Sequence, residues 1–257
     1  MSFVDTHTHL YLDEFKNDID QVVKNAIKCG VAKLLLPNID SSTSALMLNL
    51  CKKYPENCFP MMGIHPCSVK KDSIEREVQH IEKMLAENKF LAIGEIGIDL
   101  YWDKTSLDLQ KEIFIHQIKL AIKYKLPIVI HVREAFKEAI TIVENLNCDQ
   151  LSGVFHCFTG NNNDAKRIID LKNFYLGVGG VVTFKNSGLD KVIKQIPLDK
   201  IILETDSPYL APTPFRGKRN ESKYLVNIAT KLAQIKDIEI GKIKDFTTFN
   251  ANKLFNI

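Results

Sequence analysis

Two histidines one residue apart, His7 and His9, follow a short apolar start to the chain. In a β-strand, side chains two residues apart point to the same face. These two imidazoles can therefore bind one ion from one side, and a metal-bound water can act as a nucleophile at neutral pH. A lone His-x-His pair also occurs in proteins that bind no metal, so the interpretation depends on whether other ligand-type residues are placed to meet it.

Ligand-type side chains do stand at the ends of other apolar, strand-like segments. Of the seven histidines, five lie at such ends, and several carboxylates do as well. These residues are His7, His9, His65, His131 and His156, together with Glu95, Glu204 and Asp206. Histidines satisfied within a packed core explain one or two of these positions but not the whole set. The pattern therefore favours a metal site.

Strand-like and helix-like segments alternate along all 257 residues. Apolar runs predict strands over residues 3–8, 33–37, 59–64, 90–98, 127–132, 153–158, 174–178 and 200–205. Helical spacing of apolar residues predicts helices over 14–28, 42–54, 73–87, 107–124, 134–145, 164–171, 189–196, 222–234 and 241–254. We find no internal repeat and no interdomain linker.

Eight strand–helix units are typical of a (β/α)8 barrel, whose active site lies at the carboxyl ends of the strands. Those ends are where the histidines and acids fall. We therefore expect an α/β fold, a single-domain (β/α)8 TIM barrel over residues 1–257, with a doubly wound open sheet as the alternative. The glycine-rich run at 177–180 lacks the spacing of a phosphate loop, so we interpret it as backbone clearance near the site.

Composition narrows the class of protein. The chain is 45% hydrophobic and 25% charged, which is typical of a globular protein with a full core. It has no apolar run long enough to span a membrane and no export signal, and its six cysteines are scattered. We expect a cytoplasmic protein with reduced thiols, no membrane association and no obligate protein partner. The net charge of +3 permits a polyanionic substrate without demanding one.

The donor set suits a borderline ion such as Zn²⁺ or Mn²⁺. A set of six ligands, which these residues can supply, is too many for one catalytic zinc. Six ligands suit two ions about 3.5–4 Å apart that share a carboxylate. Glu95 is the candidate bridge, and Asp206 is the candidate ligand and general base. Glu204 shares a face with Asp206, which makes it a second-shell partner for a histidine or a substrate contact. An outward orientation through a strand irregularity is the alternative for Glu204.

Ordered motifs along the chain resemble the TatD family of metal-dependent deoxyribonucleases, within the amidohydrolase-like metal hydrolases. The matching stretches are Asp-Thr-His-Thr-His-Leu at 5–10, Gly-Ile-His-Pro at 63–66, Gly-Glu-Ile-Gly-Ile-Asp at 94–99, His-Val-Arg-Glu-Ala at 131–135, His-Cys-Phe-Thr-Gly at 156–160, Glu-Thr-Asp-Ser-Pro-Tyr-Leu at 204–210 and Arg-Gly-Lys-Arg-Asn-Glu at 216–221. Val132 and Ser222 depart from the usual family residues, and neither is a proposed ligand.

The resemblance implies a TIM barrel, two divalent cations (Mg²⁺, Mn²⁺ or Zn²⁺) and hydrolysis of DNA phosphodiester bonds, typically 3′-to-5′ trimming of single-stranded ends. It assigns one ion to His7, His9, Glu95 and Asp206, and the other ion to Glu95, His131 and His156. It makes His65 a substrate-facing residue, in contact with the phosphate or the leaving group.

Residues near these motifs suit a nucleic-acid substrate. Arg133, Arg216 and Arg219 can bind non-bridging phosphate oxygens. Tyr101 and the adjacent Trp102 can stack on a base, with packing at the rim of the barrel as the alternative.

Two rival functions remain open at this point. The same two-metal scaffold can hydrolyse a small cyclic amide, lactone or ester, because one barrel hosts many chemistries. Such amidases often carry a carboxylated lysine where this chain has Glu95, which counts against them. A metal-stabilised barrel that only binds a macromolecule is the second rival, and the intact ligand set with Asp206 counts against it, since a structural site needs no open coordination position.

Overall fold

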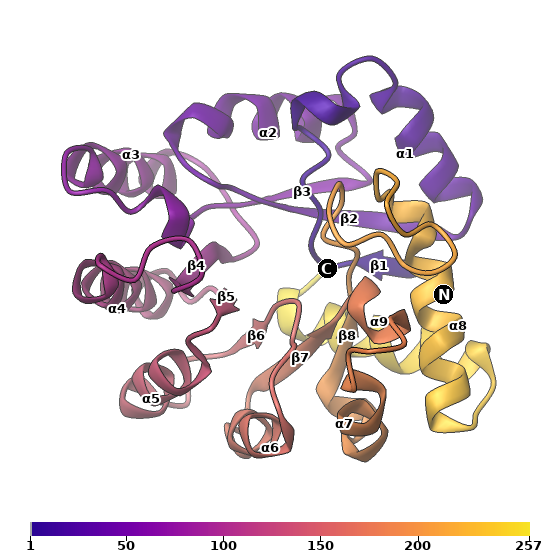
Figure 1. Cartoon of the computed structure of the whole chain (residues 1–257). Helices are drawn as coiled ribbons and strands as arrows, with labels where there is room; N and C mark the ends of the chain where they lie inside the picture. The colour runs from indigo at the N-terminus through magenta and orange to yellow at the C-terminus, as the bar shows by residue number, and fades with distance from the viewer. Residues whose placement is uncertain (1) are drawn as a thin grey trace.

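The computed structural model describes residues 2–257, in which eight parallel strands alternate with helices around a closed ring (Figure 1). The strands are β1 (Phe3–Asp5), β2 (Val31–Pro37), β3 (Cys58–Met61), β4 (Ile93–Asp99), β5 (Ile128–Arg133), β6 (Gly153–Phe155), β7 (Phe174–Val178) and β8 (Ile201–Leu203). Met1, the first residue of the predicted domain, lies outside the described residues.

Hydrogen bonds close the ring at two joints. Regular ladders connect β1 through β3 and β4 through β8. Between β1 and β8, the Thr6 amide donates to the Leu203 carbonyl at 3.1 Å. Between β3 and β4, the Gly94 amide donates to the Met62 carbonyl at 3.0 Å. The predicted (β/α)8 barrel is therefore confirmed, and the open-sheet alternative is wrong.

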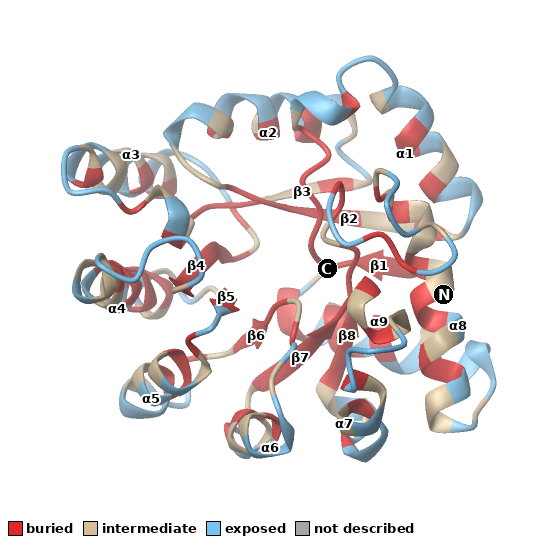
Figure 2. Cartoon of the chain, viewed as in Figure 1, coloured by how far each residue is buried: buried red, intermediate tan, exposed pale blue. Residues whose placement is uncertain are grey.

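Helices surround the barrel and turn their apolar faces inward, as the buried and exposed sides in Figure 2 show. They are α1 (Ile19–Lys28), α2 (Ser41–Lys53), α3 (Ile74–Glu87), α4 (Leu107–Tyr124), α5 (Phe136–Leu146), α6 (Asn162–Asp170), α7 (Leu189–Gln195), α8 (Leu225–Lys236) and α9 (Ile240–Phe255). In α3, for example, the buried residues Ile74, Ile81 and Leu85 recur at helical spacing. Burial of this apolar surface is the main stabilising contribution to such a fold.

The barrel interior has its own small core. Val4, Leu35, Val129 and Ile202 belong to it, and residues from the end of α9, among them Phe255, pack into the same cluster. The last helix thus packs on the interior core of the barrel. The ligand-type residues lie toward the other, carboxyl ends of the strands, with Glu95 within β4, His131 within β5 and the rest beyond their strands.

The regular strands end earlier than the sequence predicts at four of the places where ligand-type residues stand. The predicted strands 3–8, 59–64, 153–158 and 200–205 stop at Asp5, Met61, Phe155 and Leu203. Beyond the last two, Cys157 and Asp206 have positive φ angles of 43° and 58°. This left-handed backbone is costly for residues other than glycine, ends the strand geometry and redirects the side chains.

The predicted helix over 14–28 also differs. Its first turn is a separate 3₁₀ helix, Asp13–Phe15, and α1 begins at Ile19. Among residues 2–257, no helix is long and apolar enough to cross a bilayer.

Candidate metal centre

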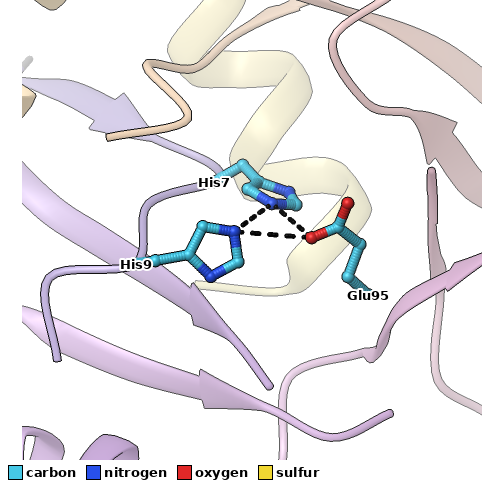
Figure 3. A group of neighbouring side chains, drawn as sticks. All are labelled: His7, His9 and Glu95. Atoms are coloured by element: carbon cyan, nitrogen blue, oxygen red, sulfur yellow. Dashed lines mark hydrogen bonds and ion pairs between the residues drawn. The ribbon is translucent and has the colours of Figure 1, made fainter. Parts of the chain in front are cut away.

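His7 and His9, just beyond β1, meet Glu95 of β4 inside the mouth of the barrel (Figure 3). Glu95 Oε2 lies 3.1 Å from His7 Nε2 and 3.4 Å from His9 Nε2, and the two nitrogens are 3.2 Å apart. All three residues are buried. Tetrahedral coordination with bonds of about 2.0–2.1 Å places ligand atoms about 3.3–3.4 Å apart. The three atoms therefore fit one divalent ion.

Tyr11 orients His9 for this role. The Tyr11 hydroxyl donates to the Pro37 carbonyl, so its oxygen accepts from His9 Nδ1, at 2.9 Å. This network assigns the His9 proton to Nδ1 and leaves the Nε2 lone pair facing Glu95. Tyr11 was not among the residues predicted from the sequence. The only feature of the sequence that could have indicated its role is that Tyr11 follows His9 by two residues, the same spacing that relates His7 to His9.

The second oxygen of Glu95 faces another pair of histidines. Glu95 Oε1 lies 2.8 Å from His131 Nδ1 and 3.4 Å from His65 Nε2, and these two nitrogens are 3.3 Å apart. Glu95 thus presents one oxygen to each pair, which is the arrangement that a carboxylate bridging two ions needs. His65 was predicted to contact the substrate, and the structure also places its Nε2 beside the Glu95 carboxylate.

His156 and Asp206 complete the cluster. The His156 ring stacks on that of His7 with 3.4 Å between centroids, and its Nε2 lies 3.7 Å from Glu95 Oε1. Asp206 Oδ1 lies 3.6 Å from His9 Nε2 and 3.8 Å from both His7 Nε2 and His156 Nε2. The structure therefore brings all six predicted metal ligands, and His65, into one cluster.

Glu204 points inward, behind His156. Its Oε1 lies 3.0 Å from His156 Nδ1 and accepts a hydrogen bond from the Cys157 amide. A Cβ atom added at Gly177 would lie 2.4 Å from Glu204 Oε2, so only glycine leaves room for this carboxylate. Glu204 is fully buried, and the alternative of an outward orientation is wrong.

Asp99 and two glutamines of α4 support the second histidine pair, and the sequence analysis assigned none of them a role. Asp99 Oδ2 lies 2.9 Å from His131 Nε2. The Gln110 side chain accepts from the Asp99 amide at 2.8 Å and donates to the Asp99 carbonyl at 3.0 Å. Gln117 holds Ile64, next to His65, in the same way at 2.7 and 3.1 Å. The sequence feature that could have indicated them is a pair of glutamines, seven residues apart, on the inner face of one helix.

The carboxylates of the centre stabilise positive charge. Burial raises the pKa of Glu95, but the facing histidines, His65 and His7 foremost, outweigh burial and hold this pKa well below its usual range. Burial lowers the pKa of His131, but hydrogen bonds to Asp99 and Glu95 raise it overall to about 9. The carboxylates beside His131 therefore favour its protonated form.

The predicted substrate contacts other than His65 lie at the rim of the barrel, and their side chains differ in how many hydrogen-bond partners the protein gives them. Arg133 places its guanidinium 3.6 Å from the ring centroid of Tyr101, and the neighbouring Trp102 is 70% exposed. Arg216 lies 3.5 Å from the ring centroid of Phe184 and is exposed.

Arg219 differs from the other two arginines. Its guanidinium forms ion pairs with Asp18 at 2.6 Å and Glu221 at 3.2 Å, and it donates to the Glu14 carbonyl at 2.6 Å. These partners occupy its donors, so the prediction of a phosphate contact is revised. Arg219 ties the loop after β8 to the segment that precedes α1.

Comparison with known proteins agrees with this geometry. A family model described as TatD related DNase matches residues 4–256. The chain is 38% identical over 254 residues to the metal-dependent hydrolase YabD of Bacillus subtilis, covering 98% of both chains. It is 31% identical over 261 residues to the metal-dependent hydrolase YcfH of Escherichia coli, covering 100% of this chain and 97% of YcfH.

Solved structures show the same architecture. The crystal structure of YJJV, a TatD homologue from Escherichia coli, matches with a TM-score of 0.93 and 28% identity over 99% of this chain and 98% of that one. A TatD family hydrolase from Entamoeba histolytica matches with a TM-score of 0.88 and 21% identity, covering 99% and 98% of the two chains.

Proposed function

This chain belongs to the TatD-related DNase family of metal-dependent hydrolases, and from that premise we propose that it hydrolyses DNA phosphodiester bonds at a two-metal centre built around Glu95. The observation that carries the proposal is the position of the Glu95 carboxylate, with one oxygen toward His7 and His9 and the other toward His65 and His131. One carboxylate shared by two groups of imidazoles is the donor set of a pair of divalent ions.

The ligands divide into two sets in this proposal. His7, His9, Glu95 and Asp206 hold one ion, and Glu95, His131 and His156 hold the other, with His65 beside it. Imidazole and carboxylate together suit Zn²⁺ and Mn²⁺, and Mg²⁺ more weakly. Glu204 and Asp99 orient His156 and His131 from behind.

Divalent ions bound here supply charge neutralisation at the phosphate and lower the pKa of a water molecule. The chain supplies the proton transfers. Asp206, whose pKa burial raises, accepts a proton from the water that attacks phosphorus. As the new P–O bond forms, the bond from phosphorus to the 3′ oxygen of the preceding nucleotide breaks. His65 contacts that oxygen as it leaves and gives it a proton.

We propose single-stranded 3′ ends as the substrate, trimmed in the 3′-to-5′ direction to 5′-mononucleotides. The rim supports a nucleic acid, because the exposed Tyr101 and Trp102 offer ring faces to a base and Arg133 lies beside them. A cytoplasmic location fits this role and stays a prediction.

The test is digestion of single-stranded DNA labelled at its 5′ end, with Mg²⁺ or Mn²⁺, by the wild type and Asp206→Asn. The proposal expects a ladder that shortens from the 3′ end and a rate about 10²–10⁴-fold lower in the variant, the usual contribution of a general base. His116→Ala, outside the cluster in α4, is the control for a substitution away from the site and keeps the wild-type rate, whereas the loss in Asp206→Asn excludes a contaminating nuclease. A strand left intact by metal-loaded wild type would contradict the proposal and favour hydrolysis of a small cyclic amide, lactone or ester.

A further inference from the structure

A second hollow lies outside the metal centre, between the loops that follow β7 and β8. It is an open pocket of about 440 Å³, lined by Phe184, Lys185, Asn186, Ser187, Thr213 and Arg216. Its volume is within the range of about 300–1,000 Å³ that is usual for ligand sites. None of the six lining residues is acidic, and two are cationic.

Hydrogen bonds fix the two walls of this pocket relative to each other. The Thr213 amide donates to Thr183 Oγ1 at 2.9 Å, and the Thr213 hydroxyl donates to the Thr183 carbonyl at 3.3 Å. On the β7 side, Ser187 Oγ donates to the Phe184 carbonyl at 2.9 Å, which closes the loop. A Cβ atom at Gly180 would lie 1.9 Å from the Leu210 carbonyl oxygen, so the two loops are in backbone contact.

The two cations of the pocket have no acidic partner. Within residues 2–257, neither Arg216 nor Lys185 has a carboxylate oxygen within 4.0 Å, and the Arg216 guanidinium donates no hydrogen bond to the protein. Its one aromatic contact, with Phe184, holds the group without using its N–H donors. Arg219, three residues on, has its donors occupied by Asp18 and Glu221. The loop therefore offers one free guanidinium, and it lies in the pocket.

The pocket and the metal centre share one face of the barrel. The loop that forms one wall begins beside Asp206, where the Tyr209 amide donates to the Asp206 carbonyl at 2.8 Å. The Tyr209 ring lies 6.3 Å from that of His9, between centroids. Loops after the seventh and eighth strands of such barrels frequently bind phosphate.

We propose that this pocket binds a backbone phosphate of the DNA strand, away from the hydrolysed bond, through Arg216 and Lys185. The inference rests on the proposed function and deepens it. Bidentate hydrogen bonds from a guanidinium match the oxygens of a phosphodiester, and the Lys185 ammonium is within the same lining. The protein therefore prefers strands long enough to reach from the metal centre to this pocket.

Binding is measured by fluorescence anisotropy of a phosphorothioate 12-mer on metal-loaded protein across a salt series. Arg216→Ala weakens binding about five- to tenfold and lowers the slope of log affinity against log salt by roughly 0.7, the share of one phosphate contact on a single strand. Lys185→Ala, on the opposite wall of the pocket, also weakens binding and lowers the slope. Arg216→Lys keeps the slope but recovers only part of the affinity, because lysine lacks the bidentate geometry. Lys218→Ala removes an equal charge from the same loop outside the lining, and it leaves the slope unchanged.

A second measurement separates this inference from the proposed function. The ratio of kcat/KM for the unmodified 12-mer to that for bis(4-nitrophenyl) phosphate falls about five- to tenfold in Arg216→Ala and stays constant in Lys218→Ala. Equal binding and equal ratios in the two variants, with DNA still hydrolysed, would overturn the pocket and leave the nuclease intact. Binding that depends on Arg216 without hydrolysis of DNA would keep the pocket and overturn the nuclease. A wild-type protein that does not bind the strand would also overturn the proposal that this pocket binds a backbone phosphate.

Discussion

The two sides of Glu95 are built differently. On one side, His7 and His9 come from the same strand end and are almost fully buried. On the other side, His65 and His131 come from two strands, and their side chains are 15% and 18% exposed. The two histidines of the first side are enclosed within the barrel, whereas those of the second side open toward the rim.

The supports of the two sides differ in the same way. His9 is oriented by Tyr11, two residues further along the chain, and Asp5, two residues before His7, accepts from the Thr205 amide at 2.9 Å and from its hydroxyl at 2.6 Å. The first side therefore carries Asp5 and Tyr11 within its own segment, and Asp5 ties that segment to Thr205 beyond β8. The second side depends on contacts from α4, distant in sequence, so its geometry is a property of the tertiary structure.

Glu95→Gln breaks both sides at once and has the largest effect. An amide lacks the charge and one of the two acceptor oxygens that a bridge needs, so both ions are lost or displaced. The loss of several kcal/mol of transition-state stabilisation corresponds to a fall in kcat of about 10³-fold. Turnover of DNA and metal content by mass spectrometry are the readouts. A variant that retains two ions and most of its activity would show that Glu95 is not the bridge.

Chelation separates the two sides by accessibility. We expect titration with EDTA to remove the ion at the exposed His65–His131 side first and the buried ion at a higher concentration. Activity falls with the first loss and returns with Mn²⁺ or Mg²⁺, because both ions act on the phosphate. Metal content and activity are followed together. Activity that survives complete removal of metal would contradict the whole mechanism.

Gln117→Leu perturbs only the second side. The change leaves the buried amide and carbonyl of Ile64 unpaired, at a cost of about 1–3 kcal/mol each in the free energy of unfolding. His65 shifts with its neighbour, and kcat falls by roughly 10²-fold while both ions stay bound, because His65 protonates the leaving oxygen and is not a ligand in the proposal. Thermal melting, metal binding and turnover are measured beside Gln21→Leu, whose side chain is exposed on α1. Equal effects of the two variants would exclude a positioning role for Gln117.

Tyr11→Phe perturbs only the first side and has the smallest effect. It removes one hydrogen-bond partner of His9 Nδ1 without opening a cavity. We expect affinity for the first ion to fall about tenfold, at the low end for a residue that orients a ligand. Isothermal titration with Mn²⁺ resolves the two sites. A loss confined to the second site would reverse the assignment of the two sides.

The sequence predicted the first side better than the second, for a physical reason. The two-residue spacing of His7 and His9 determines which face they share, and the barrel topology determines that strand ends meet. No such local rule connects Gln117 with Ile64, because their contact depends on how α4 packs against the barrel.

The arginines show the same limit. Arg216 and Arg219 are equivalent within their motif, yet only Arg219 meets Asp18, which lies 201 residues away in the chain. Whether a charged side chain is free or paired follows from the tertiary structure, and a motif does not report it.

The most direct test of the bridging role of Glu95 is anomalous X-ray scattering from crystals of the wild-type protein soaked in Mn²⁺. The account predicts two peaks about 3.5–4 Å apart, one on each side of the Glu95 carboxylate, with His7 and His9 at one peak and His131 at the other. A single peak, or two peaks that Glu95 does not join, would contradict it.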